Sequence, residues 1–361
     1  MSLEVIRQRG SLPHTRAAIK SGTVTVGFIG GSITESKDFY RSYSDHVINA
    51  LTAAFPDTRV IYQNAGIGAT TSALGAFRVK PEIIDNRCDL VFVEYAVNDH
   101  GETTELRMQT REGLLRQLMA AGNCDIVLVY TFDQGMYQKM MDGIVPNTVA
   151  EFEQLAEHYN ISSVWMGLHA LNKVREGVLR WEEWLPDGLH PEVAGSRYYA
   201  EPVIDFVVSE INSDRTDTYT LREPLSANGW ERVHTVPLES LSWKSPWKLR
   251  RMDYRSGRES FLDTSAVGAT LTIPFEGTGL FLGCITGSCS AYFDYRIDGG
   301  EWQESTFGFA DWMLENIWYR GVVMAKDLPR GSHTFELRTK HSCNPAARGT
   351  RTDICLVGVF E

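Results

Sequence analysis

The first part of the chain alternates short apolar runs with segments of helical periodicity. Strands are predicted where β-branched and apolar residues cluster, at residues 23–30, 59–63, 89–95, 125–132 and 161–166. Helices are predicted at residues 45–55 (capped by Ser44), 72–80, 103–121, 147–159 and 192–211. Strands that alternate with helices form βαβ units, so we expect a parallel sheet with helices on both faces, which is a three-layer α/β/α domain.

The pattern changes near residue 212. Residues 213–234 are polar and rich in turn-forming residues, which is typical of a linker. Beyond them, short alternating or apolar segments replace the helical period, at residues 269–275, 279–285, 291–297, 317–323 and 333–338. The sequence therefore predicts an α/β domain over 1–212, a linker over 213–234, and an antiparallel β-sandwich (jelly-roll-like) accessory domain over 235–361.

Composition and charge narrow the classes of partner. The chain has 361 residues, of which 43% are hydrophobic and 22% charged, so each part can bury a core of its own. A formal net charge of −11 disfavours nucleic acid and anionic membrane surfaces, and neutral sugars or simple esters fit it better. No apolar run approaches the ~20 residues that span a bilayer. The opening MSLEVIRQRG lacks the apolar core of a signal peptide. We therefore expect a cytoplasmic protein, with secretion left open if a leader was removed.

The cysteine pattern does not predict a metal site. Cys88 and Cys124 lie beside apolar strand-like runs, which favours buried thiols. Cys284 and Cys289 are five residues apart, but no second pair or histidine set completes a zinc site with them. A disulfide in the C-terminal part, including one between these two, stays open.

The first candidate for chemistry is a serine on a glycine-rich turn. Gly30-Gly31-Ser32-Ile33-Thr34 follows the first predicted strand, where glycines allow a sharp turn and a close approach of substrate. A phosphate-binding turn is the other reading, but the Gly-Lys-Ser/Thr element of that motif is missing.

A second candidate lies before the last predicted helix. In Asp187-Gly188-Leu189-His190-Pro191, the carboxylate stands three residues before the histidine and can reach its ring. Such a contact fixes the tautomer of the imidazole and stabilises its protonated form. By itself the pair is also consistent with a structural hydrogen bond or half of a metal site.

Two further segments follow predicted strands. Asn98-Asp99 offers a side-chain amide that can donate to an oxyanion, and residues 64–72 offer backbone N–H groups at a helix start. Each is, in isolation, also an ordinary turn. Because the carboxyl ends of parallel strands share one edge of a sheet, we expect these segments to meet Ser32 there.

Taken in order, these motifs resemble the SGNH (GDSL-like) hydrolases, whose sequence blocks centre on Ser, Gly, Asn and His. The resemblance covers about residues 20–212 and implies an SGNH/flavodoxin-like sheet with no metal or organic cofactor. It implies Ser32 as nucleophile, His190 as base and Asp187 as its orienting partner. The implied oxyanion donors are the Ser32 N–H, the Asn98 amide and a backbone N–H at Ala69 or Gly68.

One position departs from the family pattern. Ala69 stands where the second block has glycine, with Gly68 just before it. Alanine can supply the same N–H, but we expect this only with a negative φ, because a positive φ is costly for a residue with a Cβ. Gly31, Asp99 and His100 are predicted to contact the substrate.

The ester is predicted from the second domain. Family members with an added β-sandwich resemble carbohydrate esterases, so we expect hydrolysis of short-chain, chiefly acetyl, esters on a sugar or oligosaccharide. Aromatic residues at 181–184 and 307–318 either stack on sugars or pack a core, and packing is favoured. The alternatives are a lipase or thioesterase with an apolar wall at Met136, Met140 and Met141, an acyltransferase, and a non-enzymatic sugar-binding protein. The natural ester and formation of a homo-oligomer stay open.

Overall fold

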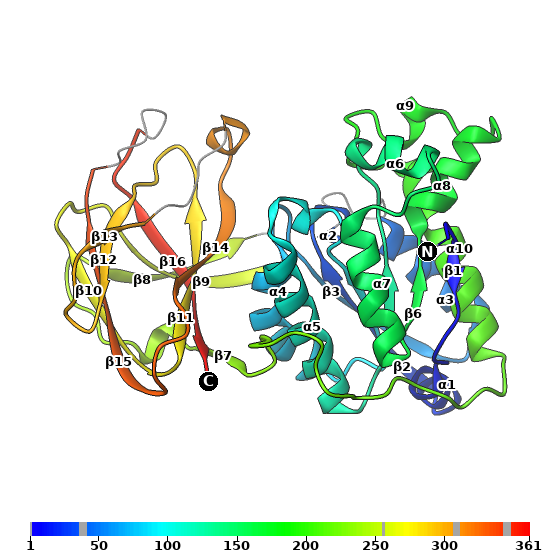
Figure 1. Ribbon diagram of the computed structural model, residues 1–361, viewed down its shortest axis with the longest axis horizontal. Helices are drawn as coiled ribbons and strands as arrows, with labels where there is room; N and C mark the ends of the chain where they lie inside the picture. The colour runs from blue at the N-terminus through cyan, green and yellow to red at the C-terminus, as the bar shows by residue number, and fades with distance from the viewer. Residues whose placement is uncertain (1, 36–41, 255–256, 306–310, 342–347) are drawn as a thin grey trace. The chain divides into compact units, whose positions relative to one another are not determined.

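The apolar runs of the first part of the chain form one six-stranded sheet (Figure 1). The computed structural model describes residues 2–35, 42–254, 257–305, 311–341 and 348–361, and it divides into two units, Met1–Glu231 and Arg232–Glu361. The strands of the first unit are β1 (Ile6–Arg7), β2 (Thr23–Gly30), β3 (Arg59–Gly66), β4 (Leu90–Glu94), β5 (Asp125–Val129) and β6 (Ser162–Val164). They lie in the order β1-β6-β5-β4-β2-β3, and only β1 is antiparallel to its neighbour.

The strand order sets where a ligand site can open. The chain passes from β2 to β3 at one edge and then returns to place β4 on the other side of β2. The five parallel strands thus have the order 2-1-3-4-5 of a flavodoxin-like sheet, and the direction of winding reverses between β2 and β4. In such sheets the crevice beyond the carboxyl ends at that point is the usual binding site.

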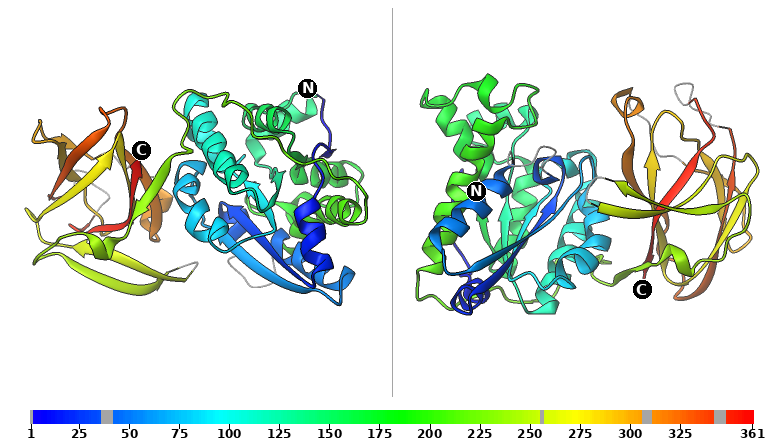
Figure 2. Two further views of the ribbon diagram at one scale, coloured as in Figure 1. Left: turned by 90° about the horizontal axis from the view of Figure 1, so that it is seen from below. Right: turned by 180° about the vertical axis from the view of Figure 1, so that it is seen from behind.

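Helices cover both faces of this sheet, so the predicted three-layer α/β/α fold is confirmed (Figures 1 and 2). They are α1 (Pro13–Lys20), α2 (Ser32–Glu35), α3 (Tyr43–Ala54), α4 (Ser72–Val79), α5 (Thr104–Ala121), α6 (Tyr137–Met141), α7 (Asn147–Tyr159), α8 (Met166–Arg175), α9 (Trp181–Trp184) and α10 (Val193–Ile211). Short turns of other helix types are η1 (Lys80–Ile84), η2 (Asn98–Gly101) and η3 (Gln134–Met136). Helices α4, α5 and α7 lie on one face, and α1, α3 and α10 lie on the other.

The start of α3 corrects a predicted cap. Helix α3 begins at Tyr43 and its N-cap is Ser42, not Ser44. The Ser42 hydroxyl accepts the Asp45 N–H at 3.3 Å, and the Asp45 carboxylate accepts the Ser42 N–H at 3.0 Å. This reciprocal capping box satisfies two backbone donors at once, which Ser44 cannot do from inside the first turn. Ser44 instead bonds the Tyr62 hydroxyl at 2.7 Å.

Much of the predicted linker packs on the first unit. The N–H groups of Leu225 and Ser226 donate to the buried carboxylate of Glu112. Trp230 is 1% exposed, and its backbone lies 2.4 Å from where a Cβ on Gly113 would stand. Residues 222–231 are therefore held to α5, and the two units divide after Glu231.

The second unit is a β-sandwich, as predicted. Its strands are β7 (Val233–Val236), β8 (Lys248–Tyr254), β9 (Gly257–Thr264), β10 (Thr270–Gly277), β11 (Gly279–Thr286), β12 (Phe293–Ile297), β13 (Gln303–Glu304), β14 (Trp318–Ala325), β15 (Gly331–Thr339) and β16 (Thr352–Phe360), with short turns η4 (Leu238–Ser240) and η5 (Asp311–Leu314). One antiparallel sheet has the order β10-β15-β12-β13, and the other has β14-β11-β16-β9-β8 with β7 beside β16. Strand β10 alternates exposed and buried residues, and both sheets bury side chains in one shared core.

The cysteines settle one open question. Cys88 and Cys124 are buried free thiols, as predicted. Cys284 and Cys289 are also both free, so they do not pair with each other, and Cys343 lies outside the described residues. Among the described helices, none combines the length and apolar character that a bilayer crossing requires.

Candidate active site

Ser32 lies where the sheet predicts a site. Strand β2 ends at Gly30 and α2 begins at Ser32, so the serine stands just beyond the carboxyl end of a central strand. The Asn98 side chain packs directly on the turn, and a Cβ on Gly31 would lie 2.0 Å from Asn98 Oδ1. Glycine at 31 is therefore required for Asn98 to approach the serine. Gly31 is buried beneath that amide, so its predicted contact with substrate gives way to a steric role.

Three of the predicted side chains form one hydrogen-bonded chain. Ser32 Oγ lies 2.9 Å from His190 Nε2, and His190 Nδ1 lies 2.8 Å from Asp187 Oδ2. The second carboxylate oxygen of Asp187 accepts the backbone N–H groups of His190 at 2.7 Å and Leu189 at 2.9 Å. The carboxylate thus holds both the ring and the backbone of the histidine, which fixes the direction in which Nε2 points.

These hydrogen bonds also set the charge of Asp187. Partial burial alone would raise the pKa of this carboxyl, but the bonds from the His190 backbone, the His190 ring and the Leu189 N–H outweigh it and lower the pKa below its ordinary value. Asp187 therefore stays ionised across the neutral range. The His190 and Asp187 side chains are 44% and 55% exposed, so the pair faces open solvent.

The loop that carries the pair is anchored to a neighbouring loop. The Gln134 N–H donates to the Gly188 carbonyl at 2.9 Å, and Gly188 adopts a φ of +79°, which favours glycine. The Glu192 N–H donates to the Trp184 carbonyl at 2.9 Å, at the start of α10. The position of His190 thus depends on contacts with residues that follow β5 and with α9.

The backbone N–H groups of Ala69 and Gly68, which the second sequence block predicted as oxyanion donors, differ from the prediction. Ala69 has a φ of +61°, so the negative φ expected for a useful alanine is not present. The N–H of Gly68 donates to the Glu35 carboxylate at 2.9 Å and is already committed there. The N–H of Ala69 makes no hydrogen bond to any residue that the structure describes. A left-handed alanine costs about 1–2 kcal/mol, and such strain is concentrated at functional sites.

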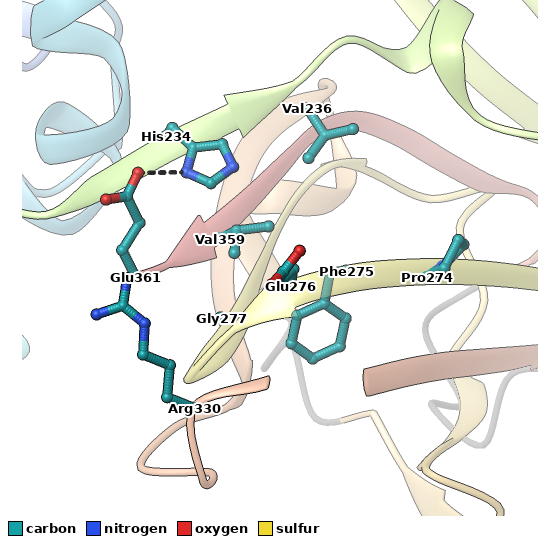
Figure 3. Close-up of a pocket in the computed structure, with 9 residues that line it drawn as sticks. All are labelled: His234, Val236, Pro274, Phe275, Glu276, Gly277, Arg330, Val359 and Glu361. Atoms are coloured by element: carbon teal, nitrogen blue, oxygen red, sulfur yellow. Dashed lines mark hydrogen bonds and ion pairs between the residues drawn. The ribbon is translucent and has the colours of Figure 1, made fainter. Parts of the chain in front are cut away.

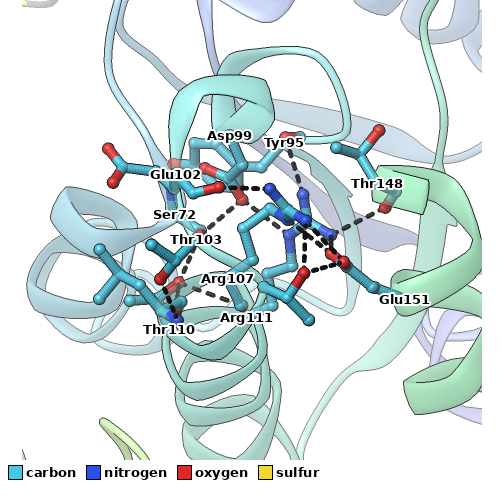
Figure 4. A network of polar contacts seen from close by, with 12 residues as sticks. Ser72, Tyr95, Asp99, Glu102, Thr103, Arg107, Thr110, Arg111, Thr148 and Glu151 are labelled. Atoms are coloured by element: carbon cyan, nitrogen blue, oxygen red, sulfur yellow. Dashed lines mark hydrogen bonds and ion pairs between the residues drawn. The ribbon is translucent and has the colours of Figure 1, made fainter. Parts of the chain in front are cut away.

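Asp99 does not offer its side chain to a substrate, contrary to the prediction. It is 0% exposed and accepts three bonds, from the Ser72 N–H at 2.8 Å, the Ser72 hydroxyl at 2.7 Å and Arg111 Nε at 2.7 Å (Figure 4). Ser72 ends the segment that contains Ala69, and Asp99 follows Asn98 directly. The buried carboxylate therefore ties together the two segments that flank Ser32.

The same network reaches two helices. Arg111 is also 0% exposed, donates to the Thr148 carbonyl at 2.8 Å and lies 3.6 Å from Glu151 Oε2 (Figure 4). Glu151 in turn holds Arg107 at 2.5 Å. Burial of charge is tolerated only when it is paired and hydrogen-bonded, and this cluster meets both conditions.

His100 is exposed on η2, and its role in substrate binding stays a prediction.

The aromatic and methionine residues considered for substrate binding lie mostly in the core. Trp184 is fully buried against Phe132 at 4.8 Å between ring centroids, which supports core packing for residues 181–184. Residues 306–310 of the other aromatic stretch lie outside the described residues. Of the three methionines of the lipase alternative, Met136 and Met140 are 2% and 3% exposed and do not form an apolar wall, whereas Met141 is 40% exposed.

Sequence reasoning missed one buried carboxylate near Ser32. Glu94 is the last residue of β4 and is 0% exposed. Burial raises its pKa to about 7, although hydrogen bonds from Thr131, the Gly31 N–H and Thr34 act in the opposite direction. The available signal was a single charged residue that ends the apolar run Leu-Val-Phe-Val-Glu.

A separate pocket of about 430 Å³ lies in the second unit (Figure 3). His234 and Glu361 pair across it at 3.0 Å, and Arg330 and Phe275 also line it. None of the predicted site residues belongs to this pocket. Within the described ranges, no group of three or more His, Cys, Asp or Glu side chains is arranged to hold a metal ion.

Comparison with known proteins agrees with this picture. Residues 28–198 match the model of the GDSL-like Lipase/Acylhydrolase family. No curated protein sequence matches the chain significantly.

Two solved structures of a two-domain esterase (CEX) active on acetylated mannans, one of them co-crystallised with mannopentaose, cover 98% of this chain and 96% of their own. Each is 22% identical to this chain, with a TM-score of 0.80. An acetylxylan esterase, Axe2 from Geobacillus stearothermophilus, is 22% identical, covers 53% of this chain and 97% of its own, and has a TM-score of 0.42. The two-domain likeness shows that both units share the fold of that esterase.

Proposed function

We propose that this protein is a serine esterase that removes acetyl groups from a carbohydrate, because residues 28–198 match the model of the GDSL-like Lipase/Acylhydrolase family. One observation carries the proposal. Ser32 Oγ lies 2.9 Å from His190 Nε2, while Asp187 holds the other ring nitrogen at 2.8 Å. A hydroxyl in contact with an oriented imidazole is the arrangement that turns serine into a nucleophile.

In the acylation step, Ser32 Oγ attacks the carbonyl carbon of the ester and His190 Nε2 takes the hydroxyl proton. Asp187, ionised at neutral pH, stabilises the imidazolium that forms. The tetrahedral intermediate then collapses. The sugar oxygen leaves with the proton from His190, and the acetyl group stays on Ser32.

The negative oxygen of the intermediate needs hydrogen-bond donors. The Asn98 amide, in contact with Gly31, is the side-chain donor best placed for this, and the Ser32 N–H is the backbone donor of the same turn. The N–H of Ala69, which bonds no described residue, is proposed as the third donor although its φ is positive, because a positive φ strains the backbone without removing the N–H. Gly68 is not included, because Glu35 already occupies its N–H.

Deacylation repeats the chemistry with water. His190 removes a proton from a water molecule that attacks the acetyl carbonyl, and Ser32 Oγ leaves with that proton. Acetate and free enzyme result.

Three features favour an acetyl ester on a carbohydrate. The catalytic pair is 44% and 55% exposed, which suits an acetyl group carried on a bulky, solvated chain. Two of the three methionines of the expected apolar wall, Met136 and Met140, are buried in the core, so only Met141, which is 40% exposed, could contact a long acyl chain. The net charge of −11 favours a neutral substrate, and the two-domain fold is shared with an esterase active on acetylated mannans.

The direct experiment measures acetate release from acetylated mannan, acetylated xylan and acetylated monosaccharides. We expect release by the wild-type protein and loss of at least about 10³-fold in kcat for Ser32→Ala, with an unchanged melting temperature. Turnover by Ser32→Ala at the wild-type rate would reject the assignment of the nucleophile.

A series of p-nitrophenyl esters separates acetyl esterase from lipase or thioesterase. We expect kcat/KM to fall as the acyl chain grows from two to eight carbons. A preference for the longer chains would reject the acetyl assignment while keeping the triad.

A further inference from the structure

Glu94 occupies an unusual place in the sheet. Strand β4 is buried along its whole length, and Glu94 is its final residue, next to Gly30 of β2 in the parallel register. Its side chain is 0% exposed. A carboxyl group in such a place is unfavourable unless several donors satisfy it. The mechanism proposed above makes no use of it.

The donors that satisfy Glu94 surround the nucleophile. The N–H of Gly31, the residue before Ser32, donates to its carboxylate. Thr34 of α2, the helix that Ser32 begins, lies at 3.4 Å from Glu94 Oε2 through its hydroxyl. Thr131, which follows β5, donates to Glu94 Oε1 at 2.8 Å. One buried carboxylate at the end of β4 thus links the residues on either side of Ser32, which follow β2, to Thr131, which follows β5.

We propose that Glu94 is a positioning residue for the reaction, because its buried carboxylate fixes the turn that presents Ser32 to His190. This inference rests on the proposed function. The ionised carboxylate can accept bonds from all three donors at once, whereas a neutral acid must itself donate from one oxygen. Only the ionised form therefore accepts from the Gly31 N–H and both threonine hydroxyls at once, because the neutral acid must reverse the direction of one of the bonds to a hydroxyl. An error of about 1 Å in the position of a reacting group can lower a rate by about 10²-fold.

The surroundings of Glu94 place its pKa near neutrality. Burial raises its pKa to about 7, and Asp99 raises it further, while the bonds from Thr131, Gly31 and Thr34 lower it. The other ionisable groups that face it are Tyr43 on α3, Tyr95 beyond β4 and Tyr199 on α10. None of these four neighbours is cationic. We therefore expect kcat to rise as the pH rises through about 7 and Glu94 becomes ionised.

The first test replaces the carboxylate by its neutral isostere, Glu94→Gln. We expect kcat for p-nitrophenyl acetate to fall by about 10-fold or more with KM changed by less than about threefold, since the turn is misplaced but the binding surface is kept. The part of the kcat–pH profile that Glu94 contributes near pH 7 should be lost. A wild-type kcat and an unchanged profile in Glu94→Gln would overturn the proposal.

The matched control is Glu112→Gln. Glu112 is also 0% exposed and also accepts backbone N–H bonds, from Leu225 and Ser226. Its hydrogen bonds to described residues hold the linker segment and Tyr159 and do not reach the nucleophile turn. We expect a lower melting temperature with kcat and the pH profile unchanged. An equal loss of kcat in this control would show that any buried glutamate has the same effect, and the proposal would fall.

A second variant tests the same idea with Glu94 in place, in case Glu94→Gln does not fold. Thr131→Val removes a hydrogen bond that lowers the pKa of Glu94. The Glu94 step in the kcat–pH profile should therefore move to higher pH. A profile identical to that of the wild type would contradict the proposal. Ser32→Ala distinguishes this failure from failure of the proposed function, because it must be inactive whatever Glu94 does.

Discussion

The buried pair of Asp99 and Arg111 allows a prediction whose size follows from the structure. Both side chains are 0% exposed, and Arg111 Nε lies 2.7 Å from Asp99 Oδ2. Asp99→Asn keeps the shape but removes the charge, which leaves the guanidinium with Glu151, at 3.6 Å, as its nearest recorded carboxylate. Loss of one partner of a buried pair costs about 3–5 kcal/mol. For a unit of this size, that corresponds to a fall of about 6–20 °C in melting temperature.

The assay is equilibrium unfolding of the full chain in urea, with the transition of the first unit compared between variants. The double variant Asp99→Asn/Arg111→Met should recover at least about 1 kcal/mol relative to the sum of the single changes. The reason is that the unpaired charge is gone and methionine can pack on Phe152, where the guanidinium now lies 4.1 Å from the ring centroid. Asp85→Asn, on an exposed ion pair with Lys80, is the control and should change stability by about 0.5 kcal/mol or less. A loss below about 1 kcal/mol in Asp99→Asn would refute the reasoning.

Three further predictions concern the turn around Ser32. Gly31→Ala places a Cβ 2.0 Å from Asn98 Oδ1, so we expect displacement of the amide and a fall of ~10²–10³-fold in kcat, and a wild-type kcat would argue that Asn98 is not used. Ala69→Gly relieves a φ of +61°, so the melting temperature should rise slightly, by the equivalent of about 0.5–1 kcal/mol; a lower value would contradict the left-handed backbone there. The pKa of Glu94 is raised by burial from 4.5 to about 7, so its contribution to stability is full below pH 4.5 and is lost as the pH rises through about 7. That loss amounts to about 3 kcal/mol, and Glu94→Gln should remove it, so denaturation curves of the two proteins from pH 4 to 8 should diverge as the pH rises.

Glu94→Gln is expected to change the stability and the activity of the protein in opposite directions. Above pH 7 the wild-type protein keeps a buried negative charge that Glu94→Gln lacks, so the variant should be the more stable and the less active protein. Strain and unfavourable charge at a site are commonly retained because function requires them. The left-handed Ala69, beside the same turn, is a second example.

The sequence determined the features that depend on local pattern. The run that became β4 is apolar up to its last residue, Glu94, and the helix over 147–159 has the predicted bounds. Both follow from the order of residues, because apolar runs and helical periodicity can be recognised in the sequence itself. The pairing of Asp187 with His190 is also local, since three residues of separation keep the carboxylate within reach of the ring. Strands that alternate with helices then predicted that Ser32 and Asn98 would meet at one edge of the sheet, and they do.

Only the tertiary structure decided which way neighbouring side chains turn. Asn98 and Asp99 are adjacent in sequence, yet one lies against the nucleophile turn while the other is buried on Arg111, because Arg111 arrives there from a helix that starts beyond both. The φ of Ala69 and the burial of Glu94 likewise depend on what packs around them, including Thr131, which follows β5. A sequence pattern predicts which positions of a helix or strand face a core. The pKa of a carboxyl and the strain of a backbone depend instead on atoms contributed by segments far apart in the chain.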